Sequence, residues 1–149
     1  MVANGDPLPP DATVILYVKK TSQLPKDGGP CTGMDLDAFR CDPDGISVTW
    51  VEHFQTAEGD PLHAAAHALK GTLNFRKSGV IARARVGDII EVMKKATREV
   101  GVRRDIVPGN DGHCLIEGIS PDELGMLSIL PDAFPSEAFK RCDEIPGLV

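Results

Sequence analysis

The chain has 149 residues, of which 42% are hydrophobic and 26% are charged, and its formal net charge at pH 7 is −6. This composition is typical of one globular domain and excludes a disordered or low-complexity chain. No apolar run approaches the roughly 20 residues that cross a bilayer, so we expect no membrane association. The Pro-rich residues 1–11 lack the features of a secretory signal, and we expect them to form a flexible segment before a single cytoplasmic domain at 12–149.

The first half of the chain predicts two strands separated by a long loop. Residues 13–18 are β-branched and aromatic, which is typical of a buried strand. Residues 19–45 are rich in Gly, Pro and Asp and predict a loop. Residues 46–50 alternate apolar and hydroxyl side chains, so we expect a half-buried strand with Trp50 in the core.

Two helices and a third strand are expected next. Asp60 and Pro61 fit the N-cap and first position of a helix that runs to Lys70. Residues 79–86 alternate again, which predicts a strand. Asp88 is the expected cap of a second helix that ends at Gly101, with one apolar stripe along it. The stripe consists of Ile89, Met93, Ala96 and Val100.

The last third predicts a hairpin and further helices. Residues 102–107 and 114–119 flank a Pro-Gly-Asn-Asp-Gly loop, a pattern typical of a β-hairpin. A capping box predicts a helix from Ser120, and residues 135–142 suggest a short one. The whole pattern predicts an α+β domain: a mixed or antiparallel sheet of about four to five strands, with two to three helices packed mainly on one face.

Charge is distributed unevenly along this acidic chain. Residues 76–104 contain nine Lys or Arg and three acids, whereas the chain as a whole is negative. Such a split predicts a charge-segregated surface that steers a partner or pairs with the protein's own acids. Within this stretch, Arg83, Arg85, Arg103 and Arg104 would form an anion-binding face if their strands were neighbours. Nucleic acid is not the expected partner, because Phe75 is the only aromatic residue nearby and the pI is about 5.1.

His113 and Glu117 are the candidate catalytic residues. Strand alternation places both on one face, where an imidazole and a carboxylate could share a cleft and act as acid and base. Cys114 faces the other way, which argues against a Cys–His dyad in this strand. The structural alternative is a solvent-exposed His and a surface Glu.

No cofactor and no metal site is expected. His63 and His67 have the i,i+4 spacing of a zinc-binding helix, but Ala64 replaces the Glu of the metalloprotease motif and a third ligand would be needed. This pair is the alternative metal site. The four cysteines, at positions 31, 41, 114 and 142, form no Cys-x-x-Cys motif and are expected to be reduced thiols.

Three segments resemble parts of a set of short bacterial proteins of unestablished function. They are the turn and strand 44–50, the strand 82–87 and the strand 112–118. In that set, an N-terminal strand, a Ser-Val-x-Trp-like strand and a His-x-x-Ile-x-Gly-like strand follow in this order. The resemblance covers less than half of the chain; it implies one domain with these strands and no catalytic residue.

Size, acidity and uneven charge favour a small protein-binding or regulatory protein over an enzyme, and an antitoxin-like or immunity-like role fits them. The expected partner is another protein. The alternative is a small enzyme acting on a phosphate-bearing or other anionic small molecule. That enzyme would use the arginines as an anion clamp and His113 with Glu117 as its acid–base pair.

Overall fold

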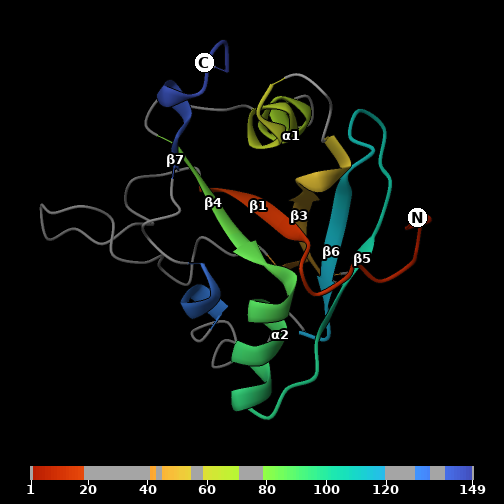
Figure 1. Cartoon of the computed structure of the whole chain (residues 1–149). Coiled ribbons are helices and arrows are strands. Elements are labelled where there is room, and N and C mark those ends of the chain that lie inside the picture. Colours follow the sequence, from red (N-terminus) through yellow and green to blue (C-terminus); the bar gives the residue numbers. More distant parts are fainter. Residues whose placement is uncertain are drawn as a thin grey trace, which may run out of the picture.

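The computed structural model describes residues 2–18, 41–42, 45–54, 59–70, 79–119, 130–134 and 140–148. These residues form one antiparallel sheet in which six strands follow the order β5-β6-β3-β1-β4-β7, and β2 pairs with β3 beside this path (Figure 1). The α+β class is therefore confirmed, and the sheet has more strands than the four to five expected. The strands are β1 (Thr13–Val18), β2 (Cys41–Asp42), β3 (Gly45–Trp50), β4 (Val80–Arg85), β5 (Gly101–Arg104), β6 (His113–Glu117) and β7 (Lys140–Arg141).

Strand β1 lies in the middle of the sheet, as its β-branched sequence predicts. Val14 pairs with Trp50 of β3 on one side and with Ala84 of β4 on the other. Val14 and Ile15 are both fully buried, although they point to opposite faces. Both faces of the sheet are therefore covered.

The two helices cover opposite faces (Figure 1). Helix α2 (Val86–Lys95) places Ile89 and Met93 against one face, whose buried side chains we call the α2-side core. Helix α1 (Pro61–Lys70) covers the other face, whose buried side chains we call the α1-side core. The expectation that helices pack mainly on one face is wrong, because the central strands present apolar side chains on both sides.

The helix boundaries follow the sequence in part. Asp60 caps α1 as expected, because its Oδ1 accepts a hydrogen bond from the Leu62 amide at 2.9 Å. Helix α2 starts at Val86, directly after β4, so Asp88 lies in its first turn and is not its cap. The helix ends at Lys95, before Thr97, whose φ of 59° is left-handed. Val100 is therefore buried beyond the helix and not within its stripe.

Three short 3-10 helices complete the described elements: η3 (Glu52–Phe54), η4 (Leu130–Ala133) and η6 (Cys142–Glu144). η4 packs near α2, while η6 contributes Cys142 to the α1-side core. Residues 140–142 thus continue from β7 into η6 and are not α-helical. The helix expected from Ser120 and most of the loop expected at 19–45 lie outside the described residues.

The described residues of the N-terminal segment, which we expected to be a flexible lead-in over residues 1–11, contact β5 and α2. Leu8 is 5% exposed and packs in the α2-side core, and its amide donates to the Val102 carbonyl of β5 at 2.8 Å. The Gly87 amide of α2 donates to the Pro10 carbonyl at 2.8 Å. Burial of one leucine and these backbone bonds hold the segment against the sheet.

Within the described residues, no helix is long and apolar enough to span a membrane.

Candidate functional site

The β5–β6 hairpin brings together four of the six side chains that the sequence indicated for catalysis or anion binding. Arg103 and Arg104 come from β5, and His113 and Glu117 come from β6. The strands pair with Gly101 opposite Glu117 and Arg104 opposite Cys114. We call these two strands with the connecting residues 105–112 the hairpin; it forms one edge of the molecule (Figure 1).

Arg83 and Arg85 lie elsewhere. They are exposed side chains of β4, which is separated from β5 by β1, β3 and β6. At about 4.8 Å per strand, this separation amounts to roughly 19 Å along the sheet. The four arginines therefore do not share neighbouring strands, which was the condition for one anion-binding face.

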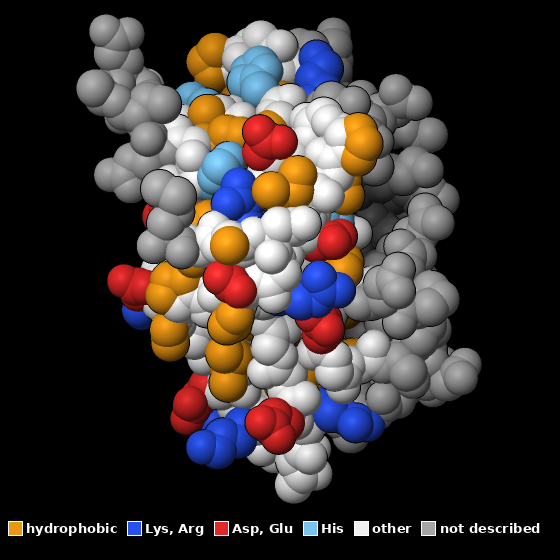
Figure 2. Space-filling view, turned by 90° about the vertical axis from the view of Figure 1, so that its right-hand side faces the viewer, with side chains coloured by type: hydrophobic (Ala, Val, Ile, Leu, Met, Phe, Trp, Pro, Cys, Tyr) orange, Lys and Arg blue, Asp and Glu red, His pale blue; other side chains and the backbone are white. Residues whose placement is uncertain are grey.

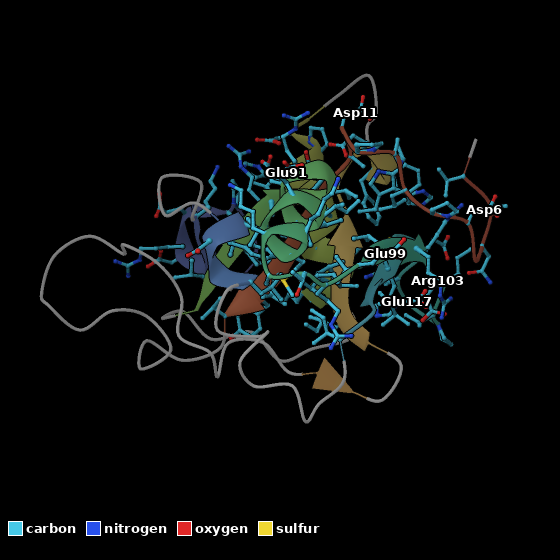
Figure 3. The ribbon with its side chains drawn as sticks, turned by 90° about the horizontal axis from the view of Figure 1, so that it is seen from below. Asp6, Asp11, Glu91, Glu99, Arg103 and Glu117 are labelled. Atoms are coloured by element: carbon cyan, nitrogen blue, oxygen red, sulfur yellow. The ribbon has the colours of Figure 1, made fainter. Side chains whose placement is uncertain are left out.

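Ion pairs run along the exposed face of the hairpin. Arg103 pairs with Glu117. Nη1 of Arg103 also lies 3.8 Å from Oδ1 of Asp105. Asp105 in turn contacts His113, whose Nδ1 is 3.3 Å from the carboxylate Oδ2 and 2.7 Å from the main-chain oxygen. Figure 3 shows Arg103 beside Glu117 at this edge. Arg103 and His113 thus each have an acidic neighbour on the same hairpin.

His113 and Glu117 do share a strand face, as predicted, but they are held by different partners. Four residues along a strand correspond to about 13 Å, which is too far for a direct hydrogen bond. Asp105 holds the imidazole, and Arg103 holds the carboxylate. The hairpin therefore brings the two residues onto one face without joining them as an acid–base pair.

Arg104 ties three parts of the structure together. Its Nη1 donates to the Val2 carbonyl at 2.7 Å, and its Nε and Nη2 donate to the Asp111 carbonyl at 3.3 Å and 3.2 Å. The guanidinium carbon lies 5.9 Å from the centre of the Trp50 ring, within the range of a cation–π contact. Arg104 thus joins the N-terminal segment, the hairpin loop and β3.

An aromatic group borders the hairpin where β3 ends. The rings of Trp50 and His53 are 5.7 Å apart, and His53 meets Phe54 edge-on at 5.0 Å. Partial burial lowers the pKa of His53, and the positive charge of Arg104 lowers that pKa further, while Asp111 opposes the shift. The His53 ring is therefore held towards its neutral form.

Trp50 is only half-buried, whereas the sequence predicted a buried core residue. It packs against the α2-side core, and its indole Nε1 is buried without a hydrogen-bond partner among the described residues. Trp50 is the last residue of β3, and its amide donates to the carbonyl of Gly112 in the hairpin loop at 2.8 Å.

Sequence reasoning missed the residue that holds the hairpin loop. Asn110 is 2% exposed; its Nδ2 donates to the Thr49 hydroxyl at 3.0 Å, and its Oδ1 accepts from the Gly112 amide at 3.0 Å. Its place in a Pro-Gly-Asn-Asp-Gly loop indicated a turn residue. Nothing in the sequence indicated that a side chain of β3 would lie beneath it.

The two helical histidines face C-terminal residues. Nε2 of His63 is 3.0 Å from Nζ of Lys140 and 3.7 Å from Oδ2 of Asp60, while Nε2 of His67 is 2.9 Å from the Pro146 carbonyl. Among the described residues, no three His, Cys, Asp or Glu side chains gather as metal ligands would. The pair instead connects α1 to β7 and to the segment that follows β7.

Cys114 points into the α2-side core, away from His113 and Glu117, as strand alternation predicted. Burial raises the pKa of the Cys114 thiol to about 12. Burial also raises the pKa of Cys142, on the opposite side of the sheet, to about 11. Both are free thiols, and neither is activated as a nucleophile.

Comparison of the chain with protein-family models, with curated proteins and with solved structures found no match in any of the three.

Proposed function

We propose that this protein is a small protein-binding or regulatory protein. Its partner would bind the connecting residues 105–112 of the hairpin, which we call the tip. The observation that carries the proposal is Ile106, which is 41% exposed and is the exposed large hydrophobic side chain of the described residues. It begins the apolar run Ile106-Val107-Pro108 at the end of β5. A central apolar group within a polar rim is the usual anatomy of a protein interface.

Hydrogen bonds to the N-terminal segment and across the hairpin support the conformation of the tip. The Ile106 amide donates to Oδ1 of Asn4 at 2.9 Å, and the Asp105 amide donates to the His113 carbonyl at 2.8 Å. Asn110 closes the loop from beneath. A preordered loop loses little conformational entropy on association, which supports recognition by this tip.

The rim of the tip is mixed in charge. The sequence predicted a charge-segregated surface, but acidic, basic and hydrophobic side chains are interspersed on the side of the molecule that carries β5 and the N-terminus (Figure 2). Asp105 contacts both Arg103 and His113 beside the tip. We therefore expect a partner that meets Ile106 with an apolar pocket and the rim with charges of both signs.

We also place the protein in the cytoplasm. Free thiols at Cys114 and Cys142 support this assignment, because disulfides predominate in oxidising compartments.

The test compares three immobilised full-length proteins as baits for native lysate, with bound proteins quantified by mass spectrometry. The baits are wild type, Ile106→Asp and the double variant Arg83→Glu/Arg85→Glu. We expect a partner that wild type and the arginine variant retain in equal amounts and that Ile106→Asp loses at least tenfold. A partner lost with the arginine variant and kept by Ile106→Asp would contradict the proposal and indicate β4 as the interface.

A further inference from the structure

Residues 2–8, which we call the arm, lie along the outer edge of β5 as an added antiparallel strand. The Gly5 amide donates to the Arg104 carbonyl at 2.8 Å, the Arg104 amide donates to the Asp6 carbonyl at 2.9 Å, and the Leu8 amide donates to Val102. Pro7 is the bridge partner of Arg103. Figure 1 shows the arm, in red, running outward from the sheet beside β5.

The arm is held mainly through its backbone and its two ends. Residues 3–7 are exposed, whereas Leu8 is 5% exposed and lies in the α2-side core. Val2 packs against the same core, and its carbonyl accepts from Nη1 of Arg104. The edge of β5 therefore offers backbone hydrogen bonds, an apolar slot for one leucine and a guanidinium that binds a carbonyl.

The sequence of the arm fits this position residue by residue. Pro7 has no amide hydrogen, and proline is tolerated where a strand forms the outer edge of a sheet. Gly5 has a φ of +89°, which side-chain-bearing residues rarely adopt. Asp6, labelled in Figure 3, projects on the outer side of the hairpin. In the pattern Gly-Asp-Pro-Leu, Gly5 thus supplies the positive φ, Pro7 suits the outer edge of the sheet, and Leu8 is the side chain buried in the core.

We propose that the edge of β5 is a strand-addition site for an extended segment of another protein with this Gly-Asp-Pro-Leu chemistry, and that the arm is its occupant in cis. Peptides added to a sheet edge gain affinity from backbone hydrogen bonds and specificity from pockets for single side chains. The arm shows both features. This site goes beyond the hairpin tip, because it uses the outer edge of β5 and the Leu8 slot.

Because the arm occupies the edge of β5, an outside segment can bind there only when the arm is released. A tethered segment competes at an effective concentration on the order of millimolar, so an outside segment of micromolar affinity binds only weakly while the arm is docked. Release of the arm exposes the edge. It also frees the Ile106 amide from Asn4, so the arm sets both the availability of the edge and the order of the tip.

Fluorescence anisotropy with a labelled synthetic peptide of residues 1–12 tests the site. The peptide is titrated into full-length wild type and two arm-release variants. Leu8→Asp would place a carboxylate in the apolar slot. Gly5→Pro removes a donor and forbids the observed φ, at a position where no atom lies within 4 Å of an added Cβ. We expect both variants to bind the peptide at least tenfold more tightly than wild type does, and a Leu8→Asp peptide to bind none of the three.

Three results would overturn the proposal. Equal binding to wild type and variants would show that the arm does not occupy the edge. No binding to the Gly5→Pro protein, with its circular dichroism unchanged, would show that the edge accepts no outside segment. Light scattering could also show a dimer for wild type and monomers for both variants. That result would show that the edge binds the arm of a second copy of this chain and not a segment of another protein.

Discussion

The amide side chain of Asn110 serves both the loop and the sheet, since it bonds the Thr49 hydroxyl and the Gly112 amide. Thr49 is fully buried and lies opposite His113 in the register between β3 and β6. Asn110 therefore links the hairpin loop to β3.

We expect Asn110→Ala to lower the free energy of unfolding by about 1–3 kcal/mol, because it leaves a buried hydroxyl and a buried amide without their partner. Urea unfolding followed by circular dichroism measures this loss. Asp111→Ala, at the exposed neighbouring position, is the matched control and should change stability by less than about 0.5 kcal/mol. Equal effects of the two substitutions would show that the Asn110 contacts do not support the loop.

The cysteines give a second test at this scale. Because the pKa of Cys114 is about 12 and that of Cys142 is about 11, both thiols stay protonated at pH 8. We expect neither to react with a thiol reagent in the native protein, whereas four cysteines react after denaturation in urea. Fewer than four would contradict the expectation of reduced thiols, which includes Cys31 and Cys41, whose side chains lie outside the described residues.

The same shift gives a pH dependence. The folded-state pKa of Cys114 lies above its usual 9.0, so the unfolded chain loses this proton first. Its contribution to stability is therefore intact below about pH 9 and is lost as the pH rises towards 12. Urea unfolding of wild type and Cys114→Ser across this range would show it. If the free energy of unfolding changed with pH equally in wild type and in the variant, the expected loss of stability at high pH would be contradicted.

At the scale of the element, the hairpin is followed by a glycine whose replacement would strain the backbone. Gly118, directly after β6, has a φ of +100°, and an added Cβ would lie 2.5 Å from the Glu99 carbonyl oxygen. Gly101, at the start of β5, has no atom within 4 Å of an added Cβ. The two positions make a matched pair on one hairpin.

We expect Gly118→Ala to destabilise the protein by about 1–3 kcal/mol, because it combines a left-handed φ with a backbone clash. Gly101→Ala should be neutral or should stabilise by up to about 1 kcal/mol, since alanine restricts the unfolded chain. Thermal unfolding of the two variants decides this comparison. The hairpin geometry would be wrong if both alanines were tolerated equally.

At the scale of the whole molecule, the sheet separates two cores. Leu69 of α1 is buried on one side, and Met93 of α2 is buried on the other. Among the described residues, α1 covers one face and α2 covers the other, so their buried side chains form two separate clusters.

We expect Leu69→Ala and Met93→Ala each to cost about 2–5 kcal/mol, the usual range for large side chains truncated in a core. Because the two sites lie on opposite faces, the double variant should equal the sum of the single effects within about 0.5 kcal/mol. A coupling energy above 1 kcal/mol in urea unfolding would show that the faces respond together.

Local patterns were sufficient to predict several elements and some orientations. The apolar run at 13–18 predicted β1, Asp60 and Pro61 predicted the start of α1, and alternation placed Cys114 opposite His113. These features depend on neighbours in the chain, such as a cap bond two residues away or the two-residue period of a strand. The sequence therefore contains them directly.

The positions of distant residues were decided by tertiary structure alone. Strand order placed three strands between Arg83 and Arg103, and it placed Leu8 of the N-terminal segment in the α2-side core. The central strands are apolar on both faces, and a continuous apolar run does not show that each face is covered by a different helix. The placement of α1 and α2 on opposite faces was therefore missed. Composition and period indicate what kind of element a segment forms and which residues of a strand share a face. The pairing of strands far apart in the chain determines which side chains meet, because those contacts depend on the free energy of the whole fold and leave no local pattern.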